Sequence, residues 1–208
     1  MEKSRTSFIT VTKTHGPAEI SELGSRFLSF VHPLASAADA DSQIAELRKA
    51  YHDATHVCTA WRLWRDGEEC RRHNDDGEPA GTAGAPILSE IERRDCFNVL
   101  VAVVRYFGGT KLGTGRLRRA YGRAARAVLD EAVPIVHVLH QQVAVTIPFD
   151  FTGDMMRIVR RFSIRIVQQT YGEKGVMMEM SVPVENLPAV EQAVSEHSLG
   201  QVSLKVLK

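Results

Sequence analysis

The sequence predicts an α+β fold in two domains, residues 1–134 and 135–208. Strand-like and helix-like segments are mixed in both halves of the chain. A helical pattern ends just before Pro134, so we place the domain boundary there. The residues that follow run in the order strand, helix, strand, strand, helix, strand, which is the order of a ferredoxin-like sandwich.

The first half is expected to begin with two paired strands, Glu19–Leu23 and Arg26–Val31. Ser36 has a side chain typical of a helix N-cap, and it predicts a helix after it. His56–Leu63 is expected to form the next strand. The polar run 65–74 is expected to be a loop.

The remainder of the first half predicts a helix, a buried strand and a second helix. Pro86 fits the first turn of the first of these helices. The apolar run Asn98–Arg105 is typical of a strand that is buried on both faces. The second helix places its apolar side chains on one face, at spacings of three and four residues. These side chains are Leu117, Tyr121, Ala124 and Val128.

The second half predicts four strands and two helices. Apolar and polar residues alternate in Val176–Val182 and in Val202–Leu207, which is typical of strands with one buried face. A hairpin turn is expected at 172–175. The strands are expected at Val143–Ile147, Ile164–Tyr171, Val176–Val182 and Val202–Leu207, and the helices at Phe151–Arg161 and Glu185–His197.

Two glycine-dense turns, 75–84 and 107–116, flank the buried strand of the first half. Each turn leads into a helix-like segment, an arrangement that leaves backbone N–H groups free to meet an anion. The first turn is acidic, and the second turn with its helix is basic. Because they flank one strand, we expect the two turns to be neighbours in space.

A stripe of arginines lies opposite the apolar face of the helix after the second turn. The stripe starts in the first turn of the helix, where the helix dipole disfavours cations unless an anion is nearby. The stripe could therefore bind phosphates of a nucleic-acid backbone, with help from backbone amides. A solvated face with salt bridges to the acidic turn is the alternative. The candidate phosphate-binding residues are Arg105, Lys111, Gly113, Gly115, Arg116, Arg119 and Arg123, and Arg126 continues the stripe.

The acidic turn has a structural and a catalytic interpretation. Aspartates in a turn accept backbone N–H bonds, which favours structural support of the neighbouring basic turn. Asp75, Asp76 and Glu78 could instead share a proton or hold Mg²⁺. Thr82 could bind a ligand or cap the following helix. The sequence has no nucleophile elbow and no convincing Ser-His-Asp series, which favours a binding role over an enzymatic one.

Two further motifs are incomplete. His56, Cys58, Cys70 and His73 have the ligand types of a zinc site, but their spacing matches no zinc finger well. The second glycine turn departs from a dinucleotide-binding fingerprint at Arg118, where a third glycine belongs. We therefore predict neither a metal nor a cofactor.

The overall composition does not indicate a partner. The chain has 26 Lys and Arg residues against 25 Asp and Glu residues, so local charge must identify any partner. Its longest apolar run is too short to span a bilayer, and three scattered cysteines form no disulfide framework. We expect a cytoplasmic protein with no membrane partner.

Both glycine turns and two shorter motifs resemble the IMPACT/YigZ family. The likeness covers residues 18–130 and departs from the family at His73-Asn74, where relatives have Ser-Ser. The chain reaches its first motif too early to contain the extra N-terminal domain of the eukaryotic relatives, so we expect the two-domain bacterial branch. The matching motifs are Asp75–Leu88, Val103–Gly115, Gly24–Phe27 and Tyr51–His56.

The resemblance implies a first domain like the second domain of a ribosomal small-subunit protein, and a second domain similar to the last domain of elongation factor G. It also implies a role in translation, since eukaryotic relatives interfere with activation of a kinase that phosphorylates an initiation factor. We expect a translation-associated regulator that binds RNA or the ribosome through its basic surface, with a protein partner in translation control as a further expectation. Two alternatives stay open: an enzyme acting on a phosphorylated or nucleotide substrate in the cleft between the glycine turns, and a protein-interaction adaptor.

Overall fold

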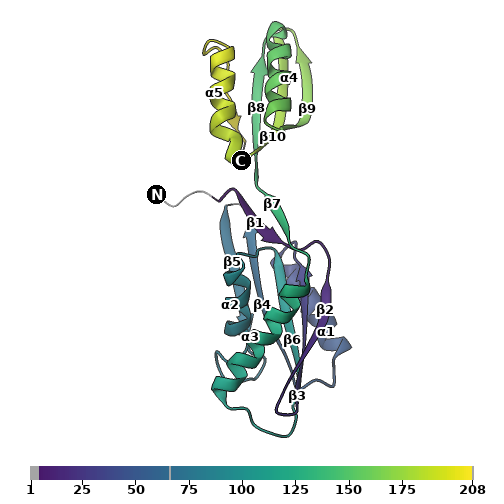
Figure 1. The fold of residues 1–208 in the computed structure, drawn as a ribbon. Helices are drawn as coiled ribbons and strands as arrows, with labels where there is room; N and C mark the ends of the chain where they lie inside the picture. The colour runs from purple at the N-terminus through teal and green to yellow at the C-terminus, as the bar shows by residue number, and fades with distance from the viewer. Residues whose placement is uncertain (1–4, 66, 208) are drawn as a thin grey trace. The chain divides into compact units, whose positions relative to one another are not determined.

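The computed structural model describes residues 5–65 and 67–207, which divide into two compact units (Figure 1). The N-terminal unit spans Phe8–His137. The C-terminal unit runs from Val138 and includes the described residues before Phe8. A domain boundary at residue 134 itself stays a proposal.

A five-stranded antiparallel sheet with the order β2-β3-β6-β4-β5 forms the centre of the N-terminal unit. The paired strands expected around Gly24 are confirmed as β2 and β3. The central strand is β6, and all its residues from Val99 to Arg105 are buried, which confirms the prediction of burial on both faces. The strands are β2 (His15–Glu22), β3 (Ser25–Pro33), β4 (His56–Arg65), β5 (Glu68–Asn74) and β6 (Val99–Tyr106).

Helices cover both faces of this sheet (Figure 1). Helix α1 (Ala37–Ala50) packs on one face, and α2 (Gly84–Arg93) and α3 (Thr114–Glu131) pack on the other. The Ser36 hydroxyl accepts a hydrogen bond from the Asp39 N–H at 3.1 Å, so the predicted N-cap is confirmed. The predicted apolar face of α3 is also confirmed, because Leu117, Tyr121, Ala124 and Val128 are all buried.

The prediction of a loop at 65–74 is wrong, because β5 pairs with β4 along its whole length. Every residue of β5 is exposed, so its polar composition marks an edge strand rather than a loop. A side-chain pair reinforces this edge: Arg62 on β4 donates to Glu69 on β5 at 2.9 Å. The two-stranded sheet formed by β1 (Ser7–Thr10) and β7 (Ile135–Val138) was not predicted either.

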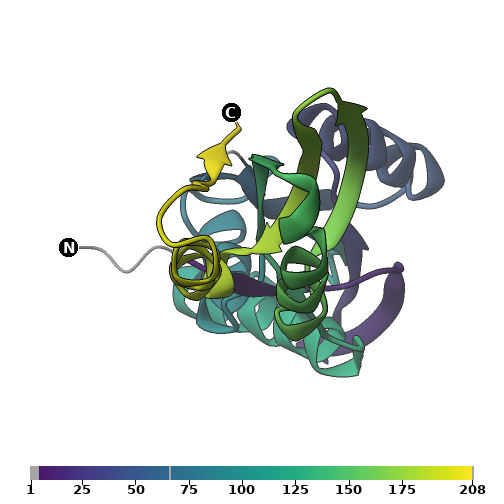
Figure 2. The same cartoon turned by 90° about the horizontal axis from the view of Figure 1, so that it is seen from above.

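The C-terminal unit has the predicted order strand, helix, strand, strand, helix, strand. Its four strands form a sheet in the order β11-β8-β10-β9. Both helices lie on the same side of that sheet (Figure 2), where Met155 and Val190 contact a core that includes Met178 and Met180. The elements are β8 (His140–Ile147), η1 (Phe149–Phe151), α4 (Thr152–Arg161), β9 (Arg165–Gly172), β10 (Gly175–Pro183), η2 (Val184–Asn186), α5 (Leu187–His197) and β11 (Lys205–Val206).

Within residues 5–65 and 67–207, no helix is both long enough and apolar enough to cross a membrane.

Candidate functional site

A buried ion pair joins the acidic turn to the end of β6. The Glu78 carboxylate accepts hydrogen bonds from the Arg105 guanidinium at 2.5 Å and from the Tyr121 hydroxyl at 2.7 Å. Glu78 is 8% exposed and Arg105 is 4% exposed, while Tyr121 on α3 is completely buried. The acidic turn therefore contacts both the strand that leads into the basic turn and the helix that follows it.

Arg105 lies inside the protein, apart from the other candidate phosphate-binding residues. Alternate residues of a strand face the same side, so Arg105 points toward α3, as Val101 and Val103 do. Its guanidinium also donates to the Ser25 hydroxyl at 3.2 Å and lies 5.5 Å from the ring centre of Phe27. A side chain with these buried partners cannot reach the backbone of a nucleic acid without breaking them.

The second glycine turn, between β6 and α3, comes close to the turn between β2 and β3 through a backbone contact. A Cβ atom added to Gly108 would lie 1.9 Å from the carbonyl carbon of Gly24, a separation that no side chain tolerates. The Gly108 N–H donates to the Ser25 hydroxyl at 3.2 Å. Gly108 is therefore needed for this approach of the β6–α3 turn to the β2–β3 turn.

Asp75 supports the N-terminus of α2. Its carboxylate accepts hydrogen bonds from the backbone N–H groups of Gly81 at 2.7 Å, Ala83 at 2.9 Å and Gly84 at 2.8 Å. Burial raises the pKa of this carboxyl, but the three backbone donors lower it more, so the pKa lies below its usual value. These hydrogen bonds support the structural interpretation of Asp75.

Asp76 and Thr82 also bond within the fold. The Asp76 carboxylate accepts from the Val57 N–H at 2.7 Å and pairs with Arg48. The Thr82 hydroxyl donates to the carbonyl of Pro79 at 2.6 Å, so Thr82 closes the turn instead of capping α2. The carboxylates of Asp75 and Asp76 thus bind backbone N–H groups and a side chain of the N-terminal unit.

The residues of the incomplete zinc motif are spread over two strands with other partners. A ring nitrogen of His56 lies 2.7 Å from the carbonyl of Asp76. Cys58 is buried, which raises the pKa of its thiol to about 12, and Cys70 is exposed on β5. Among the residues that the structure describes, no group of three or more His, Cys, Asp and Glu side chains could hold a metal ion.

The arginine stripe of α3 is exposed, as predicted, and its members differ in their partners. Arg123 pairs with Glu22 at 3.1 Å, and Arg126 pairs with Glu90 at 2.9 Å. In the described part of the chain, no acidic side chain forms an ion pair with the cations nearer the start of the helix. These unpaired cations are Lys111, Arg116, Arg118 and Arg119.

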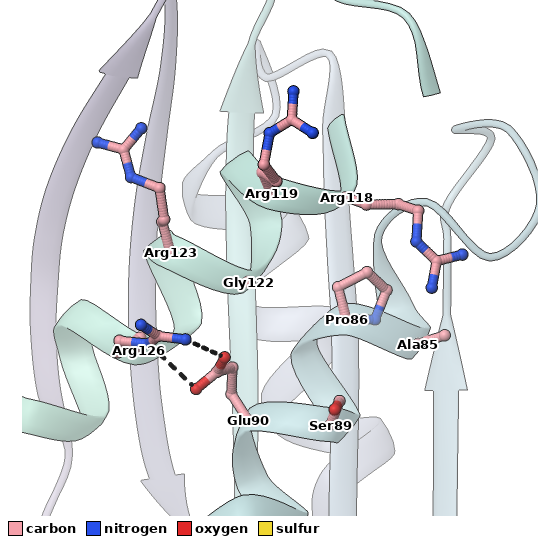
Figure 3. Close-up of a pocket in the computed structure, with 9 residues that line it drawn as sticks. All are labelled: Ala85, Pro86, Ser89, Glu90, Arg118, Arg119, Gly122, Arg123 and Arg126. Atoms are coloured by element: carbon pink, nitrogen blue, oxygen red, sulfur yellow. Dashed lines mark hydrogen bonds and ion pairs between the residues drawn. The ribbon is translucent and has the colours of Figure 1, made fainter. Parts of the chain in front are cut away.

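A groove of about 410 Å³ lies between α2 and α3 (Figure 3). Gly122 lines it on α3, and a Cβ atom there would lie 4.0 Å from Pro86 and from Glu90, which is ordinary van der Waals contact. Arg126 reaches Glu90, whereas Arg119 and Arg123 extend away from it (Figure 3). The residues that line this α2–α3 groove are Ala85, Pro86, Ser89, Glu90, Arg118, Arg119, Gly122, Arg123 and Arg126.

Glu90 places a carboxylate among several arginines at this groove. Its side chain is 12% exposed and accepts hydrogen bonds from Arg93 at 2.7 Å, Arg94 at 3.1 Å and Arg126 at 2.9 Å. Burial raises the pKa of the carboxyl, but the hydrogen bonds from Arg126, Arg93 and Arg94 lower it to about 2. One negative charge therefore contacts three positive charges, and although Arg94 also pairs with Asp130, the cluster keeps a net positive charge.

The sequence prediction and the groove overlap only in part. Arg119 and Arg123 line the groove, but Arg118 and Glu90, which also line it, were not among the predicted site residues. The spacing of Glu90 to Arg93 and Arg94, three and four residues along a helix, is the signal that could have indicated Glu90. Lys111, Gly113, Gly115 and Arg116 lie outside the groove lining, at and before the start of α3, where Gly113 is the N-cap residue with no side-chain cap.

Sequence comparisons link the N-terminal unit to a known family. Residues 23–129 match the model of the Impact N-terminal domain. Over 199 residues the chain is 30% identical to the IMPACT family member YvyE of Bacillus subtilis, a match that covers 96% of this chain and 90% of the relative. Over 185 residues it is 25% identical to the IMPACT family member YigZ of Escherichia coli, covering 88% of this chain and 90% of that protein.

Two solved structures are similar to all or part of this chain. The crystal structure of a hypothetical protein superposes with a TM-score of 0.67, covers 98% of both chains and is 23% identical, which shows a shared fold. The two-domain translational regulator Yih1 is 30% identical where it matches, over 57% of this chain and 47% of its own, with a TM-score of 0.40. Since the family model covers β3 to β6, α2 and most of α3, and the YvyE match spans nearly the whole sequence, the chain belongs to the IMPACT family, as its motifs predicted.

Proposed function

We propose that this protein is a translation-associated regulator that binds RNA, free or in the ribosome, through the exposed arginines of α3. Membership of the IMPACT family supports the link to translation, because the relative Yih1 is described as a translational regulator. One observation supports RNA as the ligand: the fold leaves Arg116, Arg118 and Arg119 exposed and without an acidic partner among the described residues.

These three arginines make a surface that favours an anion. They lie in the first half of α3, where the positive end of the helix dipole disfavours cations, and no acidic residue separates them. A phosphate would relieve this repulsion, and a guanidinium can bind two phosphate oxygens at once. The packing of α3 does not require these side chains, because its buried residues lie on the opposite face.

The carboxylates of the acidic turn favour binding over catalysis. Asp75, Asp76 and Glu78 each accept hydrogen bonds from the surrounding fold. Each of these carboxylates thus has a structural role, which supports the structural interpretation of the turn over the catalytic one. The proposal also includes a protein partner in translation control and a cytoplasmic location, both supported by the family. It further includes a likeness of the first domain to a ribosomal-protein domain, supported by the family, and a likeness of the second domain to the last domain of elongation factor G, supported by the element order.

A triple variant tests the proposal. Changing Arg116, Arg119 and Arg123 to Ala should leave the protein folded and weaken its binding to RNA of any sequence. The slope of log affinity against log salt should flatten by about 0.7 for each phosphate of a single strand that the variant no longer binds. The measurement is a titration of labelled RNA at several salt concentrations, with circular dichroism to verify folding.

The matched control removes three exposed arginines of the C-terminal unit, Arg157, Arg160 and Arg165. This control lowers the net charge by the same three units as the α3 variant, but it leaves α3 unchanged. An equal loss of affinity in the two triple variants would mean that RNA responds to total charge, and unchanged binding in the α3 variant would favour the adaptor alternative. Either result contradicts the proposal.

A gain of binding provides the reciprocal test. Glu90→Gln removes the negative charge that holds Arg93, Arg94 and Arg126. If α3 binds phosphates, this variant should bind RNA more tightly than the wild type, with a steeper dependence on salt. Weaker binding would contradict the proposal.

A further inference from the structure

The α2–α3 groove has two walls of different chemistry. Ala85 and Pro86, on the first turn of α2, form an apolar wall, and α3 supplies the cationic wall. Arg118 extends alongside Pro86 toward Ala85 (Figure 3), so a planar cation lies beside the apolar wall. A flat, neutral group could rest there, because guanidinium planes stack on rings and bases.

Charge within the groove is unevenly distributed. Arg118 and Arg119 have no acidic partner in the described part of the chain, whereas Arg126 is held by Glu90 and Arg123 by Glu22. An anionic group should therefore bind near Arg118 and Arg119. Glu90 disfavours a second anion at the other end and can accept hydrogen bonds from hydroxyl or amino groups instead.

The size of the groove distinguishes between forms of nucleic acid. A volume of about 410 Å³ falls within the usual range of sites for small ligands, so it can hold a nucleotide-sized group. A duplex keeps its bases paired and stacked, and it presents its phosphates and sugars to a protein surface. Single-stranded RNA can turn an unstacked base away from its neighbours and into such a groove.

We propose that the α2–α3 groove holds one unstacked nucleotide of single-stranded RNA, with its phosphate at Arg118 and Arg119 and its base and sugar between Pro86 and Glu90. This inference rests on the proposed function and adds a ligand class to it. The protein prefers single strands because the groove adds interactions that the exposed arginines alone do not provide.

A groove-filling variant tests the inference without removing any arginine. Gly122→Leu projects a side chain into the groove, and Gly122→Ala is the matched control, since its Cβ meets only ordinary van der Waals neighbours. Ser89→Phe fills the groove from α2, at an exposed position, and replaces Gly122→Leu if that variant fails to fold. Affinities are measured for a short single-stranded RNA and for a duplex of the same sequence at one salt concentration.

The expected result is a loss of about tenfold in affinity for the single strand in the filled variant, as for the removal of one base-stacking site. Affinity for the duplex, and both affinities of Gly122→Ala, should stay within about twofold of the wild type, since neither change removes a base-stacking site that the RNA uses. An unchanged affinity for the single strand, or an equal loss for the duplex, would overturn the inference.

Failure of this inference differs from failure of the proposed function. If the groove-filling variants bind like the wild type while the triple arginine variant does not, RNA binds outside the groove and the proposed function stands. If the wild type binds neither RNA, the proposed function fails. Release of the labelled single strand by polyglutamate as efficiently as by unlabelled RNA would show that the protein binds any flexible polyanion and would also overturn the inference.

Discussion

The carboxylate of Glu78 lies 2.5 Å from the guanidinium of Arg105, and both side chains are almost completely shielded from water. This ion pair connects the acidic turn with β6, and the Tyr121 hydroxyl adds α3 through the same carboxylate oxygen. An unpaired charge in such surroundings is costly, because the interior cannot replace the water that the charge has lost. The pair is therefore a sensitive point of the N-terminal unit.

Glu78→Gln should destabilise the protein by about 3–5 kcal/mol, because it leaves the charge of Arg105 buried without a partner. Urea unfolding followed by circular dichroism measures the change. Glu19→Gln is the matched control: it breaks the exposed pair between Glu19 and Arg26, and its effect should be small. Similar losses in the two variants would mean that the buried pair has no special role.

Asp75→Ala should destabilise the N-terminal unit by about 1–3 kcal/mol, because the three backbone N–H groups at the start of α2 lose their acceptor. The free energy of unfolding from urea titrations gives the magnitude. Asp41→Ala removes an exposed carboxylate on α1 and should have little effect. Hydrogen exchange should become faster in α2 than in α1, and uniform exchange would argue against a local role of Asp75.

Glu90 should contribute stability that depends on pH. Its pKa is about 2 in the folded protein, below the ordinary 4.5, so its contribution is fully present above pH 4.5 and is lost as the pH falls toward 2. The difference in unfolding free energy between the wild type and Glu90→Gln should therefore shrink over this interval. A difference that stays constant from pH 7 to pH 2 would show that the arginine cluster does not hold the carboxylate in its charged form.

Gly108→Ala should lower the melting temperature by several degrees, because its Cβ atom would collide with the backbone of Gly24. The β6–α3 turn would then have to move away from the β2–β3 turn. Gly115→Ala is the comparison, since its Cβ atom lies 3.8 Å from Arg119 and Ala favours a helix interior. Gly115→Ala should keep or raise the melting temperature. Equal destabilisation by both changes would point to a general need for glycine in this turn.

The helices and strands that the sequence predicted correctly are those whose residue pattern lies within the segment itself. The apolar spacing of Leu117, Tyr121 and Val128 identifies α3 without reference to other segments, and the same holds for the apolar run of β6. The edge strand β5 was missed because its seven exposed residues carry no periodic pattern, and only the pairing with β4 makes it a strand. β1 and β7 were missed for the same reason: each is a strand only because it pairs with the other, and more than half of the sequence lies between them.

The candidate site was predicted less completely, for a related reason. The arginine stripe is visible in the sequence, but its charge does not reveal which side chains are buried. Arg105 follows Val101 and Val103 at alternate positions of β6, and this spacing indicates that it faces the core. The groove itself needs α2 beside α3, so Pro86, Glu90 and Gly122 acquire a common role only in the folded protein.

The turn 75–84 contacts both helices that form the groove, although none of its residues lines the groove. Asp75 holds the first backbone amides of α2, and Glu78 holds Tyr121 on α3. A short segment at the end of the sheet thus connects the two helices and contributes, with their packing on the sheet, to the width of the groove. Changes in this turn would alter which ligands fit between α2 and α3 while every residue in contact with the ligand stayed the same.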